Sequence, residues 1–141
     1  MPVIEASRKM ENTLGVGGSY WAFGLYEFAL DGGAVGDIAL RGAPVIPSGA
    51  VIINALIYVD TVPTSGGAAT IAIKTEGAAD INAADAISGA PWSSTGAKRG
   101  DFDADTAPIL TTAARTITAT VATAALTAGK FSVFVEYIVV R

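Results

Sequence analysis

Residues 51–62 read Val-Ile-Ile-Asn-Ala-Leu-Ile-Tyr-Val-Asp-Thr-Val and carry the strongest secondary-structure signal in the chain. Side chains of a β-strand alternate between its two faces. One face of this run is therefore wholly apolar and consists of Val51, Ile53, Ala55, Ile57 and Val59. The other face is mixed and consists of Ile52, Asn54, Leu56, Tyr58 and Asp60. This pattern predicts a long strand whose apolar face lies in a core.

The same alternation recurs along most of the chain between segments rich in Gly and Pro. It predicts further strands at residues 20–30, 37–41, 69–74, 107–112, 115–123 and 130–140. The last two are expected to be joined through residues 124–129, in which Gly129 supplies a turn glycine. Residues 80–88 have a spacing that suits only one or two helical turns. Short strands at regular spacing predict an all-β fold, an antiparallel β-sandwich of the jelly-roll kind.

The domain organisation follows from a change in composition near residue 19. Residues 1–19 are polar and end in the glycine cluster Leu14-Gly-Val-Gly-Gly-Ser19, which predicts a flexible N-terminal arm. Residues 20–141 are long enough for one β-sandwich domain and too short for two domains of ordinary size.

Composition argues against catalysis and against several classes of partner. The 141 residues contain no Cys and no His, so there is no thiol nucleophile, no imidazole base and no His/Cys zinc site. We expect no enzymatic activity, no cofactor and no metal. The net charge of −4 offers no basic surface for nucleic acid. The longest apolar run, residues 131–140, is about half of what a membrane helix requires, and the N-terminus lacks the apolar centre of a signal peptide. We therefore expect neither a nucleic-acid nor a membrane partner, and a protein made in a cytoplasm.

Hydrophobic residues make up 51% of the chain and charged residues only 16%. A small monomer has little interior in which to bury so much apolar surface, whereas a symmetric oligomer gains buried faces. We therefore expect the protein to associate with itself. The apolar side chains of the mixed strand faces are the predicted subunit contacts: Trp21, Phe23, Ile52, Leu56, Tyr58, Phe134 and Ile138.

Carboxylates offer weaker alternatives. Asp101, Asp103 and Asp105 have the spacing of the first calcium ligands of an EF-hand loop, but Thr106 and Thr112 stand where that loop needs Gly and Glu. Whether they bind a divalent ion stays open. Carboxylate pairs of the glycosidase kind are conceivable at Asp80 with Asp85 and at Glu27 with Glu136. Glu136 equally suits an interface salt bridge to Arg41 or Arg115.

Residues 89–105 form the longest stretch without periodicity and are the expected contact loop. The aromatic residues of the first predicted strand, together with Trp92, also allow a second interpretation, a carbohydrate-binding platform. Core or subunit packing is the preferred interpretation because no Asn, Asp or Gln lies among residues 20–26 to bind sugar hydroxyls.

Three stretches carry a resemblance to a known group of proteins. They are residues 45–60, residues 69–87 and residues 114–137, which includes Ala114-Arg-Thr-Ile-Thr-Ala-Thr-Val-Ala-Thr123. In residue pattern and strand order, residues 44–140 resemble the head decoration, or cement, proteins of tailed bacteriophages. The resemblance implies a β-sandwich subunit, often trimeric, bound outside the capsid at junctions of the major capsid protein, with an N-terminal arm that reaches neighbours. It carries no catalytic or ligand motif.

Together these observations predict a structural virion protein that decorates and stabilises the exterior of a tailed-phage capsid as a homotrimer. Its expected partners are its own copies and the major capsid protein. Its expected location is the virion exterior, after assembly in the host bacterial cytoplasm. The alternative is a carbohydrate-binding or adhesion module of a phage fibre or tail.

Overall fold

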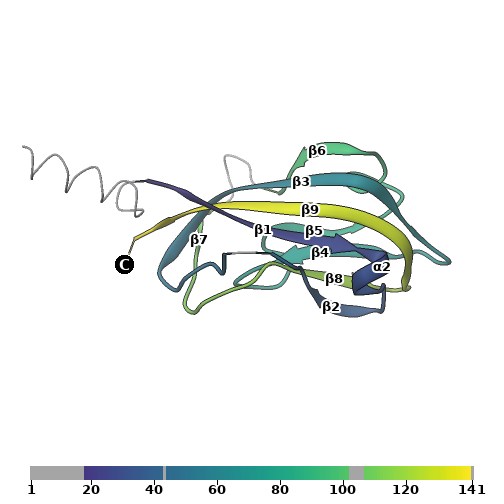
Figure 1. The fold of residues 1–141 in the computed structure, drawn as a ribbon, viewed down its shortest axis with the longest axis horizontal. Helices are drawn as coiled ribbons and strands as arrows, with labels where there is room; N and C mark the ends of the chain where they lie inside the picture. The colour runs from purple at the N-terminus through teal and green to yellow at the C-terminus, as the bar shows by residue number, and fades with distance from the viewer. Residues whose placement is uncertain (1–17, 43, 102–106, 141) are drawn as a thin grey trace, which may run out of the picture.

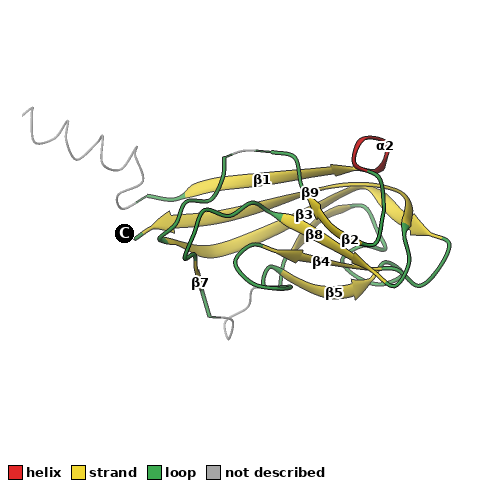
Figure 2. Ribbon diagram, turned by 90° about the horizontal axis from the view of Figure 1, so that it is seen from below, coloured by secondary structure: helices red, strands yellow, loops and turns green. Residues whose placement is uncertain are grey.

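The computed structural model describes residues 18–42, 44–101 and 107–140. Within them the chain forms two antiparallel sheets packed face to face, with one short helix, α2 (Phe28–Asp31) (Figures 1 and 2). The predicted all-β sandwich is therefore confirmed. The predicted arm lies outside the described residues except for Gly18 and Ser19.

Sheet A has the strand order β1-β9-β3-β6, with β7 paired to β3. Its strands are β1 (Tyr20–Glu27), β9 (Leu126–Val139), β3 (Ala50–Ser65), β6 (Gly96–Arg99) and β7 (Ile109–Leu110). Sheet B has the order β2-β8-β4-β5 and consists of β2 (Gly36–Ala39), β8 (Thr118–Ala122), β4 (Thr70–Lys74) and β5 (Asn82–Ala86). Most connections cross from one sheet to the other, so each sheet is built from strands that are distant in sequence (Figure 1).

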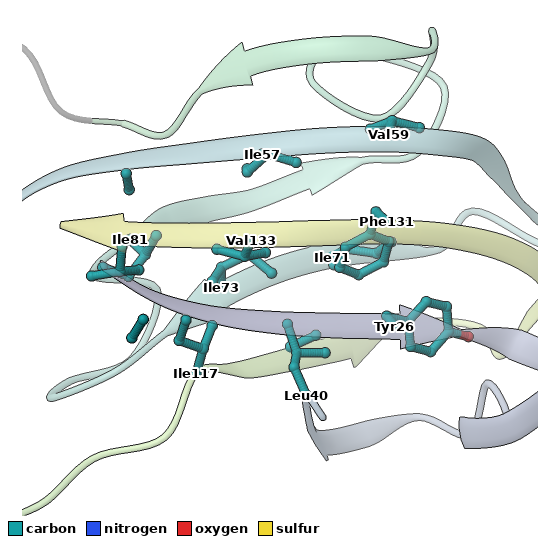
Figure 3. Close-up of a cluster of buried hydrophobic side chains, with 14 of the residues drawn as sticks. Tyr26, Leu40, Ile57, Val59, Ile71, Ile73, Ile81, Ile117, Phe131 and Val133 are labelled. Atoms are coloured by element: carbon teal, nitrogen blue, oxygen red, sulfur yellow. The ribbon is translucent and has the colours of Figure 1, made fainter. Parts of the chain in front are cut away.

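The core lies between the sheets and consists of aliphatic and aromatic side chains. Figure 3 shows Ile57, Val59, Phe131 and Val133 of sheet A facing Ile71 and Ile73 of sheet B. Trp92 joins this core although it comes from a loop: it is 0% exposed, packs on Phe131 with ring centroids 4.8 Å apart, and donates its indole N–H to the Ile71 carbonyl at 3.2 Å. Burial of a large aromatic ring with its polar atom satisfied is strongly stabilising.

A β-bulge in β3 changes which residues of the strand face the core. The pairing of β3 with β9 shifts register between Ile52 and Asn54, so that Ile53 is an extra residue. Ile52 is 0% exposed and Ile53 is 42% exposed, whereas Ala55, Ile57 and Val59 are buried as the alternation predicts. The expectation that Ile52 lies on the outer, mixed face is therefore wrong, because the extra residue inverts the alternation before Asn54.

Other expectations are corrected by non-local pairing. Residues 82–86, expected to be helical, form β5, because pairing with β4 outweighs a weak local preference. Residues 89–105, expected to lack regular structure, contribute Trp92 to the core and contain β6, which pairs with β3; their role as a contact loop stays a prediction. The long strand expected at residues 115–123 is shorter and begins at Thr118.

The connection between β8 and β9 is a crossover between sheets and not the expected hairpin. β9 begins at Leu126, so Gly129 lies inside the strand, with φ +140°. A Cβ atom there would come within 3.0 Å of Pro63 of the paired strand. Gly129 therefore permits a close approach of β9 to β3 rather than a turn.

Candidate assembly surface

The face of sheet A that points away from the core is apolar across three strands. The strand register places Phe23 of β1, Phe134 of β9 and Leu56 of β3 in one row, with Leu25 and Tyr58 flanking Ser132 in the next. Phe23 and Phe134 lie with ring centroids 6.5 Å apart. Val51 continues the surface, since it pairs with both Ile138 and Leu110. Together these residues define what we call the outer face of sheet A: Trp21, Phe23, Leu25, Val51, Leu56, Tyr58, Leu110, Phe134 and Ile138.

Side chains on this face are large and remain accessible to solvent. Trp21 is 42% exposed, Phe23 39% and Tyr58 47%, while Leu56, Phe134 and Ile138 are half-buried by their neighbours. Single exposed hydrophobic residues are ordinary, but contiguous ones mark contact surfaces. This face is therefore a candidate interface.

Among the described residues, three charged side chains start within the apolar part of this face, and one of them, Arg41 opposite Leu25, forms an ion pair with Asp31. Glu136 lies between Trp21 and Asn54 in the register and accepts a hydrogen bond from Ser19 Oγ at 2.9 Å. Arg99 lies opposite Leu56, and directly opposed residues of an antiparallel pair point to the same side. Arg99 is exposed and also borders a cleft of about 330 Å³ with Asp85 and Asp101. In the described part of the chain, neither Glu136 nor Arg99 forms an ion pair.

The outer face of sheet B has a different composition. Thr118 and Thr120 of β8 alternate with buried Ala119 and Val121, which leaves small polar side chains outside. Asp37 accepts hydrogen bonds from Lys74 Nζ at 2.6 Å and Thr120 Oγ1 at 2.7 Å, and the Lys74 bond, more than that of Thr120, lowers the pKa of Asp37. The charges of this face are paired with one another, so sheet B presents a solvated surface.

The structure places most of the predicted contact residues together. Trp21, Phe23, Leu56, Tyr58, Phe134 and Ile138 lie on the outer face of sheet A, whereas Ile52 lies in the core. Leu25 was missed although it shares the period of Trp21 and Phe23. Val51, Leu110 and Arg99 carry no local signal, because the bulge and the pairings with β3 bring them to this face.

The two arginines suggested as interface partners of Glu136 pair with other carboxylates of the same chain. Arg41 pairs with Asp31 at 2.8 Å and Arg115 pairs with Glu76 at 2.7 Å. Burial raises the pKa of Asp31, but hydrogen bonds from Arg41 and from the Glu27 N–H outweigh it and leave that pKa below its usual value. Hydrogen bonds from Arg115 and then Thr112 lower the pKa of Glu76 to about 2. Both arginines are therefore occupied.

The predicted carboxylate pairs are structural or far apart. Asp80 accepts hydrogen bonds from the N–H groups of Thr75, Glu76 and Gly77 and so holds the turn after β4. Asp85 accepts a hydrogen bond from Asn82. Glu27 lies six positions along β1 from Trp21, the residue opposite Glu136, which amounts to roughly 20 Å. A glycosidase requires about 5–10 Å between its two carboxyl groups.

The candidate ion site is only partly described. Asp101 Oδ2 accepts a hydrogen bond from the Ala83 N–H at 2.5 Å, while Asp103 and Asp105 lie outside the described residues. Within residues 18–42, 44–101 and 107–140, no group of three or more His, Cys, Asp or Glu side chains is placed to hold a metal ion. No helix in the same ranges is long and apolar enough to cross a membrane.

Trp92 cannot be part of an exposed sugar-binding platform, because it is fully buried in the core. Trp21 and Phe23 are exposed; Phe23 lies opposite Phe134, whereas Trp21 lies opposite Glu136, which already accepts a hydrogen bond from Ser19. The aromatic residues of β1 therefore divide between core packing, as for Tyr26, and the outer face.

Comparison with solved structures identifies the same fold in chains from two phage capsids. A chain in "Cyanophage Pam1 capsid asymmetric unit" matches with a TM-score of 0.62 and 16% identity, over 86% of this chain and 85% of that chain. A chain in "Acidic stable capsid structure of Helicobacter pylori bacteriophage KHP30" matches with a TM-score of 0.55 and 17% identity, over 86% and 87%. No protein-family model and no curated protein matches the sequence. This chain thus shares the β-sandwich fold of chains that occur in phage capsid structures.

Proposed function

We propose that this chain is a non-enzymatic structural protein of a tailed-phage virion, which binds the exterior of the capsid and stabilises it as a homo-oligomer. The observation that carries the proposal is the apolar outer face of sheet A, which residues 18–42, 44–101 and 107–140 leave uncovered although they bury the inner faces of both sheets. Exposing such a face to water costs free energy, and this cost is removed when another protein covers the face.

The strand order supports the expected jelly roll. The order β1-β9-β3-β6 in one sheet and β2-β8-β4-β5 in the other arises when eight strands pass back and forth between two sheets as two Greek keys. The short strand β7 is an addition to this plan. The fold likeness to chains of the two phage capsids supports the virion role by analogy, since a fold by itself does not determine function.

A structural role also agrees with how the charges are used. The ion pairs Arg41–Asp31, Lys74–Asp37 and Arg115–Glu76 hold turns and strand ends, so these carboxylates serve the fold rather than a reaction. A protein that binds many equivalent sites on a shell gains avidity from oligomerisation, because linked weak contacts reinforce each other. The homotrimer implied by the resemblance, and the arm formed by residues 1–19, remain predictions.

The test is rebinding to capsids of the encoding phage that lack this protein. Purified full-length protein is mixed with such capsids, unbound protein is removed by sedimentation, and the temperature at which the shells rupture is measured. We expect saturable binding and a higher rupture temperature, and antibodies to the protein should label intact particles. Capsids that neither bind the protein nor gain heat resistance would contradict the proposed role.

The alternative adhesion module is tested with the same protein. Because Trp92 is buried, only Trp21 can report glycan binding by fluorescence quenching. Quenching by surface glycans of the host, lost in Trp21→Ala, would favour the adhesion module over capsid decoration.

A further inference from the structure

The outer face of sheet A combines an apolar surface with one carboxylate and one guanidinium that form no ion pair with any described residue. Glu136 lies on β9 and Arg99 on β6, with β3 between them. The two residues are two strands apart, at about 4.8 Å per strand, and are offset by two residues along the strands. Their Cα atoms are therefore about 12 Å apart, and their side chains form no ion pair with each other. In the described part of the chain, the guanidinium of Arg99 has no hydrogen-bonding or ionic partner, and the carboxylate of Glu136 has only the hydroxyl of Ser19.

Any protein that covers this face must therefore supply two opposite charges. Burying a charge without a partner costs several kcal/mol, whereas a partner of opposite sign offsets much of that penalty. The occupant needs a cation over Glu136 and an anion over Arg99, about 12 Å apart. A second copy of this chain carries both groups at that spacing.

We infer that two copies pair through the outer faces of sheet A about a two-fold axis, so that Glu136 of each copy meets Arg99 of the other. This inference rests on the self-association part of the proposed function and specifies the contact. In a two-fold interface, if residue i contacts residue j then j also contacts i. An axis midway between the two charges satisfies this condition, and it passes over β3 near Asn54 and Leu56.

Geometry favours a two-fold over a three-fold arrangement for this face. A three-fold ring joins two different surfaces of each subunit, which must be inclined to one another. Here both charges start on one face of one sheet. In a trimer of the kind implied by the resemblance, the subunits would contact each other through a different surface. Two such trimers could then pair through the outer face of sheet A.

The available area is sufficient for a specific contact. Four strands about 4.8 Å apart and eight residues of about 3.3 Å each cover roughly 500 Å² when projected on a plane. Two copies would then bury about 1,000 Å² or more, the lower limit for a specific interface. With so little area to spare, the two charge pairs should decide whether the complex forms.

The decisive experiment mixes two oppositely charged variants. Glu136→Arg gives a face with two guanidinium groups, and Arg99→Glu gives a face with two carboxylates. Each variant alone should self-associate at least about tenfold more weakly than the natural chain, because like charges meet at both pairs. An equimolar mixture should form a heterodimer with an affinity within about threefold of the natural pair. Sedimentation velocity measures each affinity, and native mass spectrometry distinguishes the heterodimer by mass.

Matched controls make the same changes of net charge on the other sheet. Asp37→Arg and Lys74→Glu lie on the outer face of sheet B, where no contact is proposed. They should self-associate like the natural chain. If they dissociate as strongly as the test variants, net charge and not pairing controls association, and the inference is overturned.

Crosslinking locates the axis independently. The chain contains no cysteine, so Leu56→Cys introduces a single thiol next to the proposed axis. A short bismaleimide should join two such chains efficiently, while Ala39→Cys on sheet B should give little product. Equal yields from the two variants would contradict the proposed axis.

The remaining outcomes separate the inference from the proposed function. If the mixture does not associate, or if both charge variants associate normally while Phe134→Asp does not, the charge pairing is wrong although self-association stands. If the natural chain is a single subunit at high micromolar concentration, self-association fails. Rebinding to capsids then still decides the virion role, with the capsid surface as the occupant of this face.

Discussion

The two sheets of this sandwich have similar inner faces and very different outer faces. Both inner faces are apolar and meet in one core. Outside, sheet B presents threonines, alanines and internally paired charges, whereas sheet A presents Trp21, Phe23 and Tyr58 with two charges that have no ionic partner among the described residues. The contrast teaches that, of the two outer sheet faces, only that of sheet A carries a contiguous set of large apolar side chains. A chain built only to remain soluble would have no reason for this asymmetry.

The most severe way to break the asymmetry is a charge in the middle of the apolar face. Phe134→Asp buries a carboxylate without a partner in any complex formed there, and should weaken self-association about a hundredfold or more. Thr118→Asp is the matched change on sheet B, next to Lys74 in the register, and should leave association unchanged. Sedimentation velocity over a concentration series measures both. Equal behaviour of the two variants would mean that the faces are not functionally different.

The bulge in β3 defines where the core face of sheet A ends and the outer face begins. Ile52→Ala removes a fully buried side chain and should lower the free energy of unfolding by about 2–5 kcal/mol. Ile53→Ala removes an exposed one and should change it by less than about 1 kcal/mol. Urea unfolding in the Phe134→Asp background measures both without a contribution from dissociation. A larger loss of stability in Ile53→Ala than in Ile52→Ala would contradict the assignment of Ile53 as the extra residue of the bulge.

A smaller effect should appear on acidification, at the ion pair beyond β4. The Glu76 pKa is about 2, lowered from 4.5 by Arg115 and Thr112. Because the folded-state pKa is depressed, the stabilisation by ionised Glu76 is complete above about pH 4.5 and is lost as the pH falls towards 2. The melting temperature of Glu76→Gln should therefore lie below that of the natural chain above pH 5, and the difference should vanish near pH 2. A difference that is constant with pH would show that the ionised pair has no role.

The sequence allowed the fold class to be predicted well, because alternation of side chains is a local property. Residues 51–62 and 130–140 follow the β-period closely, and both form the long central strands of sheet A. Trp21 and Phe23, two of the predicted contact residues, lie on the outer face with Phe134.

The sites where prediction failed all depend on contacts between distant segments. Residues 82–86 have weak local preferences, and pairing with β4 makes them a strand. Trp92 enters the core because the loop before β6 folds over the end of the sandwich and its indole N–H finds the carbonyl of Ile71. Neither contact can be predicted from the sequence pattern of the neighbouring residues.

By itself, the sequence determined that this protein is a β-sandwich with more apolar strand surface than one core can bury, because side-chain period and composition are properties of the chain alone. Only the tertiary structure decided which surface remains uncovered. An extra residue at Ile53 inverts the faces of β3, and the order of strands brings Glu136 and Arg99 to one face. The physical reason is that register and strand order are set by pairing across the sheets, where a shift of one residue exchanges inside and outside.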